Sequence, residues 1–376
     1  MTKLRTDFRK AIGQLLIIGF DGTEMSRRLR ALLTGIQPAG VILFARNIVA
    51  AEQTYRLLKE CQACVSARLF TCVDMEGGEV DRFRNVLGRA PAAADVFRSG
   101  DRRLSRKQGR VLGEACRALG FNTDFAPVVD LVSEVSREVM SSRAVSANPA
   151  EVIRYARDFL DGLRSAGVLG TLKHFPGLGE ANLDTHHALP SVHKAWKQLW
   201  EQDLAPYRAL RREAPMVLVG HATYPAVTRS RTPASLSKKW IRDILQKKVG
   251  YRGLVVSDDL EMGGVLKAAP IEQAAVAHIR AGGDLCLVCH LEEHVVRCHE
   301  ALTRAWEQDR EFARRCRQSI ERVLAFKHKS RELHRPTPAP NPLRIEKLTR
   351  RLWELGEQVR FEQLTAEGGG GRRRPA

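Results

Sequence analysis

Short apolar runs alternate along this chain with charged segments in which apolar residues recur every three to four positions. Each run has the length of a strand, and many are rich in Val, Ile and Leu. Buried strands separated by amphipathic helices are typical of a parallel sheet covered by helices. The runs comprise residues 15–20, 40–45, 69–74, 123–131, 170–175, 216–222, 253–259 and 284–289.

The number of runs decides which parallel fold is expected. Eight strands favour a (β/α)8 TIM-type barrel over a doubly wound sheet, although the first run, 15–20, could equally end a helix. We therefore predict an α/β protein with one barrel domain over residues 1–333. The clearest helical patterns between the runs cover residues 105–119, 150–166, 194–212 and 238–249.

The pattern changes after the barrel. Residues 334–342 contain four prolines and predict a stiff, extended linker. Residues 343–365 predict an amphipathic helix, whose apolar stripe covers either the flank of the barrel or a partner subunit. Residues 366–376 predict a flexible basic tail. The stripe consists of Ile345, Leu348, Leu352, Leu355 and Val359.

Charge is the unusual feature of the composition. The chain has 61 Lys+Arg against 43 Asp+Glu, a formal net charge of +18. This excess indicates either an anionic partner or simply basic solvent-facing surfaces. No aromatic-rich basic segment accompanies it, so we do not expect nucleic-acid binding.

Cysteine usage and the N-terminus indicate the compartment. Several of the eight cysteines lie inside apolar runs, which is typical of reduced core thiols. Residues 1–22 lack the features of a secretory signal, and no run of about 18 apolar residues predicts a membrane span. We therefore expect a cytoplasmic protein, and we expect it to be a monomer.

Acidic and histidine side chains gather where the predicted strands end, which is where barrel enzymes build their active sites. The loop 173–190 adds more titratable groups behind Pro176, Gly177 and Gly179, which shape its backbone. A solvated polar loop is the alternative reading, but the concentration at equivalent positions favours a reaction site. The residues are Asp74, Glu76, Asp124, Asp130, His174, Glu180, Asp184, His186, His187, His221, Asp258 and Asp259.

Metal binding is the less favoured reading of these histidines. The chain has no H-E-x-x-H or H-x-H signature, so a metal-dependent hydrolase is not expected. Cys289, His290, His294 and Cys298 do not match the usual zinc spacings. We expect neither a metal nor another cofactor.

Two clusters instead predict acid–base and nucleophilic chemistry. Asp258 ends a buried strand, where a rigidly held carboxylate can attack a carbon atom. Asp184 lies two residues before His186, close enough to orient an imidazole that acts as general acid and base. A nucleophilic carboxylate with a separate proton donor is the logic of a retaining glycosidase.

At these residues the chain resembles the single-domain, NagZ-type β-N-acetylhexosaminidases of glycoside hydrolase family 3. The resemblance extends from about Gly13 to about Cys289. It is carried, in order, by GQLLIIGFDG, GVILFARN, VDMEGGEVDRF, FAPVVDL, KHFPGLGE, DTHHALP, GHATYP, PASLSKKW and GLVVSDDLEM.

The resemblance implies a function and residue roles. It implies Asp258 as nucleophile and Asp184 with His186 as the acid–base dyad. It also implies a retaining exo-β-N-acetylglucosaminidase without metal that acts on N-acetylglucosamine-containing saccharides, such as peptidoglycan fragments in the cytoplasm. Sugar-binding roles are implied for Asp74, Arg82, Arg143, Lys173 and His174.

Several positions depart from the family pattern. Leu178, Glu180 and Ala181 replace the His, Asp and Thr of K-H-F-P-G-H-G-D-T, and Glu79 replaces an Arg. Arg143 lies in R-A-V where R-S-F is usual. These departures leave open a β-glycosidase of altered sugar preference or a carbohydrate-binding protein without catalysis. A β-glycoside phosphorylase also stays open, because a His acid–base carries less negative charge than a carboxylate and repels an incoming phosphate less.

Overall fold

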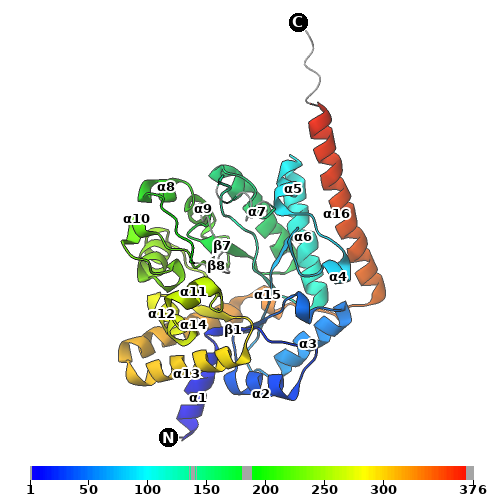
Figure 1. Ribbon diagram of the computed structural model, residues 1–376. Helices are drawn as coiled ribbons and strands as arrows, with labels where there is room; N and C mark the ends of the chain where they lie inside the picture. The colour runs from blue at the N-terminus through cyan, green and yellow to red at the C-terminus, as the bar shows by residue number, and fades with distance from the viewer. Residues whose placement is uncertain (1, 135, 137–139, 141, 180–188, 370–376) are drawn as a thin grey trace.

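Eight parallel strands form a nearly closed barrel with helices around it, which confirms the predicted (β/α)8 fold (Figure 1). The computed structural model describes residues 2–134, 136, 140, 142–179 and 189–369, and the strand count refers to these. The order around the barrel is β6-β3-β2-β1-β10-β9-β8-β7. The strands are β1 (Leu16–Ile18), β2 (Gly40–Ile42), β3 (Phe70–Val73), β6 (Thr123–Asp124), β7 (Thr171–Phe175), β8 (Met216–Val219), β9 (Leu254–Asp259) and β10 (Leu285–Val288).

Helices cover the outside of the barrel, and a small antiparallel hairpin of β4 (Met75–Gly77) and β5 (Val80–Asp81) follows β3. The longer helices are α1 (Thr2–Gly13), α2 (Arg27–Ile36), α3 (Ala51–Ala63), α6 (Arg102–Leu119), α7 (Pro149–Ala166), the π-type helix η3 (Lys239–Lys248), α12 (Ile271–Ala281), α13 (Glu292–Gln308), α14 (Arg310–Lys329) and α16 (Pro342–Gly369). The shorter ones are η1 (Ala45–Asn47), α4 (Arg84–Leu87), α5 (Ala93–Arg98), α8 (Trp196–Glu201), α9 (Ala205–Leu210), α10 (Pro225–Thr228), η2 (Ala234–Leu236), α11 (Gly263–Ala268) and α15 (Arg331–His334).

Strand side chains alternate between the barrel interior and the helix layer. In β10, Leu285 and Leu287 belong to the cluster that fills the interior, whereas Cys286 and Val288 pack in the cluster beneath the helices. All four are buried. A strand buried on both faces has no polar positions, which explains why the sequence shows continuous apolar runs.

The barrel closes between β6 and β7 with few hydrogen bonds. The prediction extended the β6 strand to residue 131, but the ladder is limited to Thr123–Asp124. Pro127 has no N–H to donate, so it cannot continue the ladder. The Asp124 N–H donates to Leu169 O at 2.8 Å, and the Thr171 N–H donates to Ala126 O at 2.8 Å.

The segment predicted as one helix over 194–212 is two helices, α8 and α9. Pro206 stands in the first turn of α9, where its missing N–H is tolerated, and it would break the interior of a continuous helix. Between the two helices, the Asp203 carboxylate accepts a hydrogen bond from Lys194 Nζ at 2.9 Å. This buried ion pair stabilises the turn between α8 and α9.

Helices α6 and α7 pack unusually closely through glycine. A Cβ atom on Gly109 would lie 2.2 Å from Phe159 O, and one on Gly162 would lie 2.4 Å from Arg106 O. Real Cβ atoms do not approach backbone atoms this closely, so each glycine permits the contact. The pair α6 and α7 therefore forms a rigid flank beside β6 and β7.

The C-terminal helix α16 runs along the outside of the molecule past α4, α5 and α6 (Figure 1). Its predicted apolar stripe packs into the main core, with Leu352 and Leu355 fully buried. The stripe thus covers the flank of the barrel. The opposite face includes Trp353, which is 64% exposed. Among the described residues, no helix is long and apolar enough to cross a membrane.

Candidate active site

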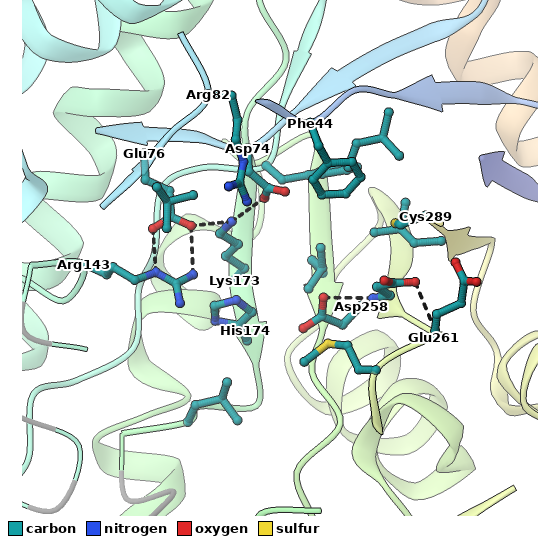
Figure 2. Close-up of a pocket in the computed structure, with 18 of the residues that line it drawn as sticks. Phe44, Asp74, Glu76, Arg82, Arg143, Lys173, His174, Asp258, Glu261 and Cys289 are labelled. Atoms are coloured by element: carbon teal, nitrogen blue, oxygen red, sulfur yellow. Dashed lines mark hydrogen bonds and ion pairs between the residues drawn. The ribbon is translucent and has the colours of Figure 1, made fainter. Parts of the chain in front are cut away.

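A cavity of about 440 Å³ opens at the C-terminal ends of the barrel strands. Figure 2 shows Glu76, Arg143, Lys173 and His174 along one side and Asp258 along the other. The wall also contains apolar residues, so the cavity combines a few charged groups with hydrophobic surface, as ligand sites do. The apolar lining includes Ile42, Phe44, Val80, Phe125, Met140, Leu178, Leu218, Met262 and Leu287.

Lys173 projects from β7 between two carboxylates. Its Nζ donates to Asp74 Oδ1 at 2.7 Å and lies 2.6 Å from Glu76 Oε1. Asp74 follows β3 directly, and Glu76 lies in β4. Burial alone would lower the pKa of the Lys173 ammonium, but Asp74 and Glu76 outweigh burial and raise it. Lys173 is therefore a fixed cation in the cavity wall.

Glu76 also holds Arg143 in a two-pronged ion pair. Arg143 Nε and one Nη donate to the two Glu76 oxygens, both at 2.8 Å. Burial opposes ionisation of Glu76, but the charges of Arg143 and Lys173 hold the pKa of this carboxyl well below its usual range. One buried carboxylate thus positions two cationic side chains at the cavity.

His174 is oriented by Asp130. The His174 Nδ1 lies 2.7 Å from Asp130 Oδ2, and the other Asp130 oxygen accepts the Leu178 N–H at 2.7 Å. A carboxylate that accepts from Nδ1 fixes the ring and leaves Nε2 as the free nitrogen of the ring. Asp130 therefore links the ring of His174 to the start of the following loop.

Asp258, near the end of β9, faces this cationic wall across the cavity (Figure 2). Burial alone would raise the pKa of the Asp258 carboxyl, but His174 and His221 lower it below its ordinary value. The Asp259 N–H also donates to Asp258 Oδ1 at 2.9 Å. Asp258 is therefore an ionised carboxylate near neutral pH, as a nucleophile must be.

Arg82 offers hydrogen-bond donors that the protein does not use. Its Nε is buried without a hydrogen-bond partner among the described residues. The guanidinium carbon lies 5.6 Å from the centre of the Phe44 ring, which lines the same cavity. A buried donor without a partner costs free energy unless a ligand satisfies it, so Arg82 is suited to bind one.

Two carboxylate–histidine pairs form the rim beyond Asp258. His290 Nε2 lies 3.1 Å from Asp259 Oδ2, and His294 Nδ1 pairs with Glu261 at 2.6 Å. These pairs tie the loop after β9 to the loop after β10. Within the described part of the chain, no group of three or more His, Cys, Asp or Glu side chains is arranged to hold a metal ion.

Six of the eight residues to which the family resemblance gave roles line one cavity: Asp74, Arg82, Arg143, Lys173, His174 and Asp258. Their individual roles stay predictions. Asp184 and His186, the proposed dyad, lie outside the described residues, as do Glu180, Ala181 and His187.

Other strand-end residues prove to be structural supports. Asp124 is fully buried and accepts the Met75 N–H at 2.9 Å. His221 lies between Ser235 Oγ at 2.7 Å and Asp259 O at 2.8 Å. Glu76 and Asp130 were expected among the strand-end carboxylates, but no role for either followed from the sequence.

Comparison with known proteins identifies relatives of the chain. Residues 7–326 match the model of the glycosyl hydrolase family 3 N terminal domain. A Beta-hexosaminidase of Idiomarina loihiensis is 35% identical over 279 residues, covering 73% of this chain and 83% of that protein. A Beta-hexosaminidase of Alkalilimnicola ehrlichii is 37% identical over 287 residues, covering 74% and 82%.

A solved structure shares the fold as well. The glycoside hydrolase family 3 beta-N-acetylglucosaminidase from Paenibacillus sp. str. FPU-7 superposes with a TM-score of 0.86 at 33% sequence identity. The match covers 92% of this chain and 68% of that one.

Proposed function

The chain belongs to glycoside hydrolase family 3, and we propose that it is a retaining exo-β-N-acetylglucosaminidase. Its catalytic domain is a glycoside hydrolase. The observation that carries the proposal is the ionised Asp258 facing Lys173 and His174 across one cavity. The names of the relatives support N-acetylglucosamine as the sugar.

Asp258 attacks the anomeric carbon in the proposed reaction. The new bond joins an Asp258 carboxylate oxygen to C1, while the bond from C1 to the glycosidic oxygen breaks. His186, oriented by Asp184, gives its proton to the departing oxygen. It then takes a proton from water, which attacks C1 and releases Asp258. Two displacements at C1 retain its configuration.

Sugar recognition falls to the groups around the cavity. Asp74 accepts hydrogen bonds from hydroxyl groups, and Arg82, Arg143, Lys173 and His174 donate or hold the ring in place. Charge-assisted hydrogen bonds contribute about 1.5–3 kcal/mol each. Arg82 is well suited because its buried Nε has no partner within the described residues.

The proposal also includes the natural substrate, the cellular compartment and the oligomeric state. We assign peptidoglycan fragments as substrate and the cytoplasm as its compartment. All eight cysteines are free, which supports a reducing environment. We propose a monomer in which residues 1–333 form the catalytic domain and α16 covers the flank of its own barrel.

A panel of aryl β-glycosides tests the proposal: N-acetylglucosaminide, glucoside and xyloside, each with and without phosphate. We expect preferential release of free N-acetylglucosamine, independent of phosphate. Asp258→Asn should lower turnover about a thousandfold or more, while Asp259→Asn, which removes the neighbouring carboxylate, should cost much less.

Each other outcome would indicate a different function for this protein. A sugar 1-phosphate product would establish phosphorolysis. A preference for the glucoside or the xyloside would show that N-acetylglucosamine is not the preferred sugar. Sugar binding without turnover of any aryl glycoside would leave a carbohydrate-binding protein. If Asp258→Asn and Asp259→Asn lowered turnover equally, Asp258 would not be the nucleophile.

A further inference from the structure

A second pocket lies at the opposite end of the barrel from the active site, where the C-terminal extension crosses the barrel. Its volume is about 300 Å³, at the lower end of the range of roughly 300–1,000 Å³ for small-molecule sites. Its walls come from α3, from the start of β3, from the C-terminal end of α6 and from residues 333–337. Tyr55 of α3 anchors the extension, since its hydroxyl donates to Thr337 O at 2.7 Å.

The lining is basic and contains no carboxylate. Lys59, Arg68, Arg117 and Arg335 line the pocket, together with His334 and several neutral hydrogen-bonding groups. No ion pair joins any of the four Lys and Arg side chains to an acidic residue within the described chain. Lys59 instead lies over the Tyr55 ring at 5.3 Å.

Arg117 is the central cation and is only 6% exposed. Its guanidinium donates to the backbone oxygens of Glu332, Arg335 and Pro336, at 3.4, 2.6 and 3.3 Å. The Glu332 carboxylate points elsewhere, accepting from the Ser330 hydroxyl at 2.8 Å. Backbone oxygens orient Arg117 but do not neutralise its charge.

The extension brings further positive charge to this place. Burial, with the charges of Arg335 and Arg344, lowers the pKa of Arg117. Positive charges near the buried Arg117 disfavour the docked extension, and a counter-charge in the pocket would offset this. The lining offers no carboxylate to supply that charge, whereas a bound anion would supply it.

We propose that this pocket binds a phosphate group, with Arg117, Lys59 and Arg68 as its principal cations and Thr71 and Asn122 in the polar wall. A phosphate carries up to two negative charges and several acceptor oxygens, which matches a lining that holds several cations and no acid. Free phosphate and a phosphate monoester present the same chemistry. Binding stabilises the docked extension, and therefore α16, through residues 333–337.

Calorimetric titration of the full-length protein with inorganic phosphate, pyrophosphate and glycerol 3-phosphate tests this proposal, with sodium chloride at matched ionic strength as reference. We expect saturable binding at one site outside the active site and a phosphate-dependent rise in Tm. Lys59→Gln/Arg68→Gln should weaken binding about tenfold or more. The tightest of the three ligands identifies the source of the phosphate group.

Two controls separate this pocket from other basic surfaces. Lys239→Gln/Arg212→Gln removes the same charge from exposed positions elsewhere and should leave the affinity unchanged. Arg82→Gln, in the active-site cavity, should also leave it unchanged. Absence of saturable binding, or equal weakening in either control, would overturn the proposal. Hydrolysis of an aryl glycoside by the Lys59/Arg68 variant reports separately on the proposed function.

Discussion

Glu76 is the residue on which the cationic wall of the active-site cavity depends. It lies 67 positions before Arg143 in the chain, yet it accepts two hydrogen bonds from that guanidinium and pairs with Lys173. The sequence showed Asp74, Lys173, His174 and Asp258 at strand ends, because strand ends follow from the apolar pattern. It could not show the Glu76–Arg143 pair or the Asp130–His174 pair, because pairings between distant loops leave no periodicity.

The depressed pKa of Glu76 predicts acid sensitivity. A carboxyl whose pKa is lower in the folded state adds stability that is fully present above its ordinary value of 4.5 and is lost as the pH falls below it. Glu76→Gln should lower the free energy of unfolding by about 3–5 kcal/mol at pH 7. It should also flatten the decline in stability between about pH 5 and pH 3.

Urea unfolding across this pH range measures both effects. Glu79→Gln is the matched control, since Glu79 is exposed on the same hairpin and should behave like the wild type. Parallel stability curves for wild type and Glu76→Gln would show that Glu76 is not the group responsible.

Among the elements, the strands were easier to predict than their connections. The eight apolar runs all contain barrel strands, but Pro127 shortened β6 and Pro206 divided one expected helix into α8 and α9. Both differences arise from a proline, which has no N–H to donate. Whether this loss interrupts a strand or a helix depends on the exact position of the proline in that element. A run of apolar residues specifies the type of element more firmly than its ends.

The close contact of α6 with α7 can be tested by adding one methyl group. Gly109→Ala places a Cβ 2.2 Å from Phe159 O and should destabilise the protein by about 1–3 kcal/mol. Gly35→Ala adds the same group in α2, where nothing lies within 4 Å, and should stabilise by about 0.5–1 kcal/mol. Thermal and urea unfolding measure the stability of both variants. If Gly109→Ala and Gly35→Ala changed stability in the same direction, the close packing of α6 on α7 would be contradicted.

The packing of α16 against the barrel can be tested by substitution in the same way. Leu352→Ala should lower the free energy of unfolding by about 2–5 kcal/mol, because Leu352 is fully buried against the barrel. Trp353→Ala, at the next position, removes a side chain that is 64% exposed and should change stability by less than about 0.5 kcal/mol. If Trp353→Ala were the more damaging change in urea unfolding, the exposed face would be the packed one.

At the scale of the whole molecule, the barrel separates two kinds of site. The C-terminal ends of the strands hold a cavity in which carboxylates and cations face each other, whereas the other end holds a pocket lined by cations without a carboxylate. The net charge of +18 was visible in the sequence, but its clustering was not, since it depends on where residues 333–337 cross the barrel. The fold was predictable from local pattern, and the second pocket was not.

The central claim is that Asp258 forms a covalent bond to N-acetylglucosamine. Peptide mass spectrometry after incubation with a 5-fluoro-N-acetylglucosaminyl fluoride tests it most directly, because the fluorine slows release of the intermediate. We predict one fluorosugar per chain, on Asp258, and none on Asp258→Asn. A label on Asp259 or Glu261, or turnover of the reagent without any trapped intermediate, would contradict the account.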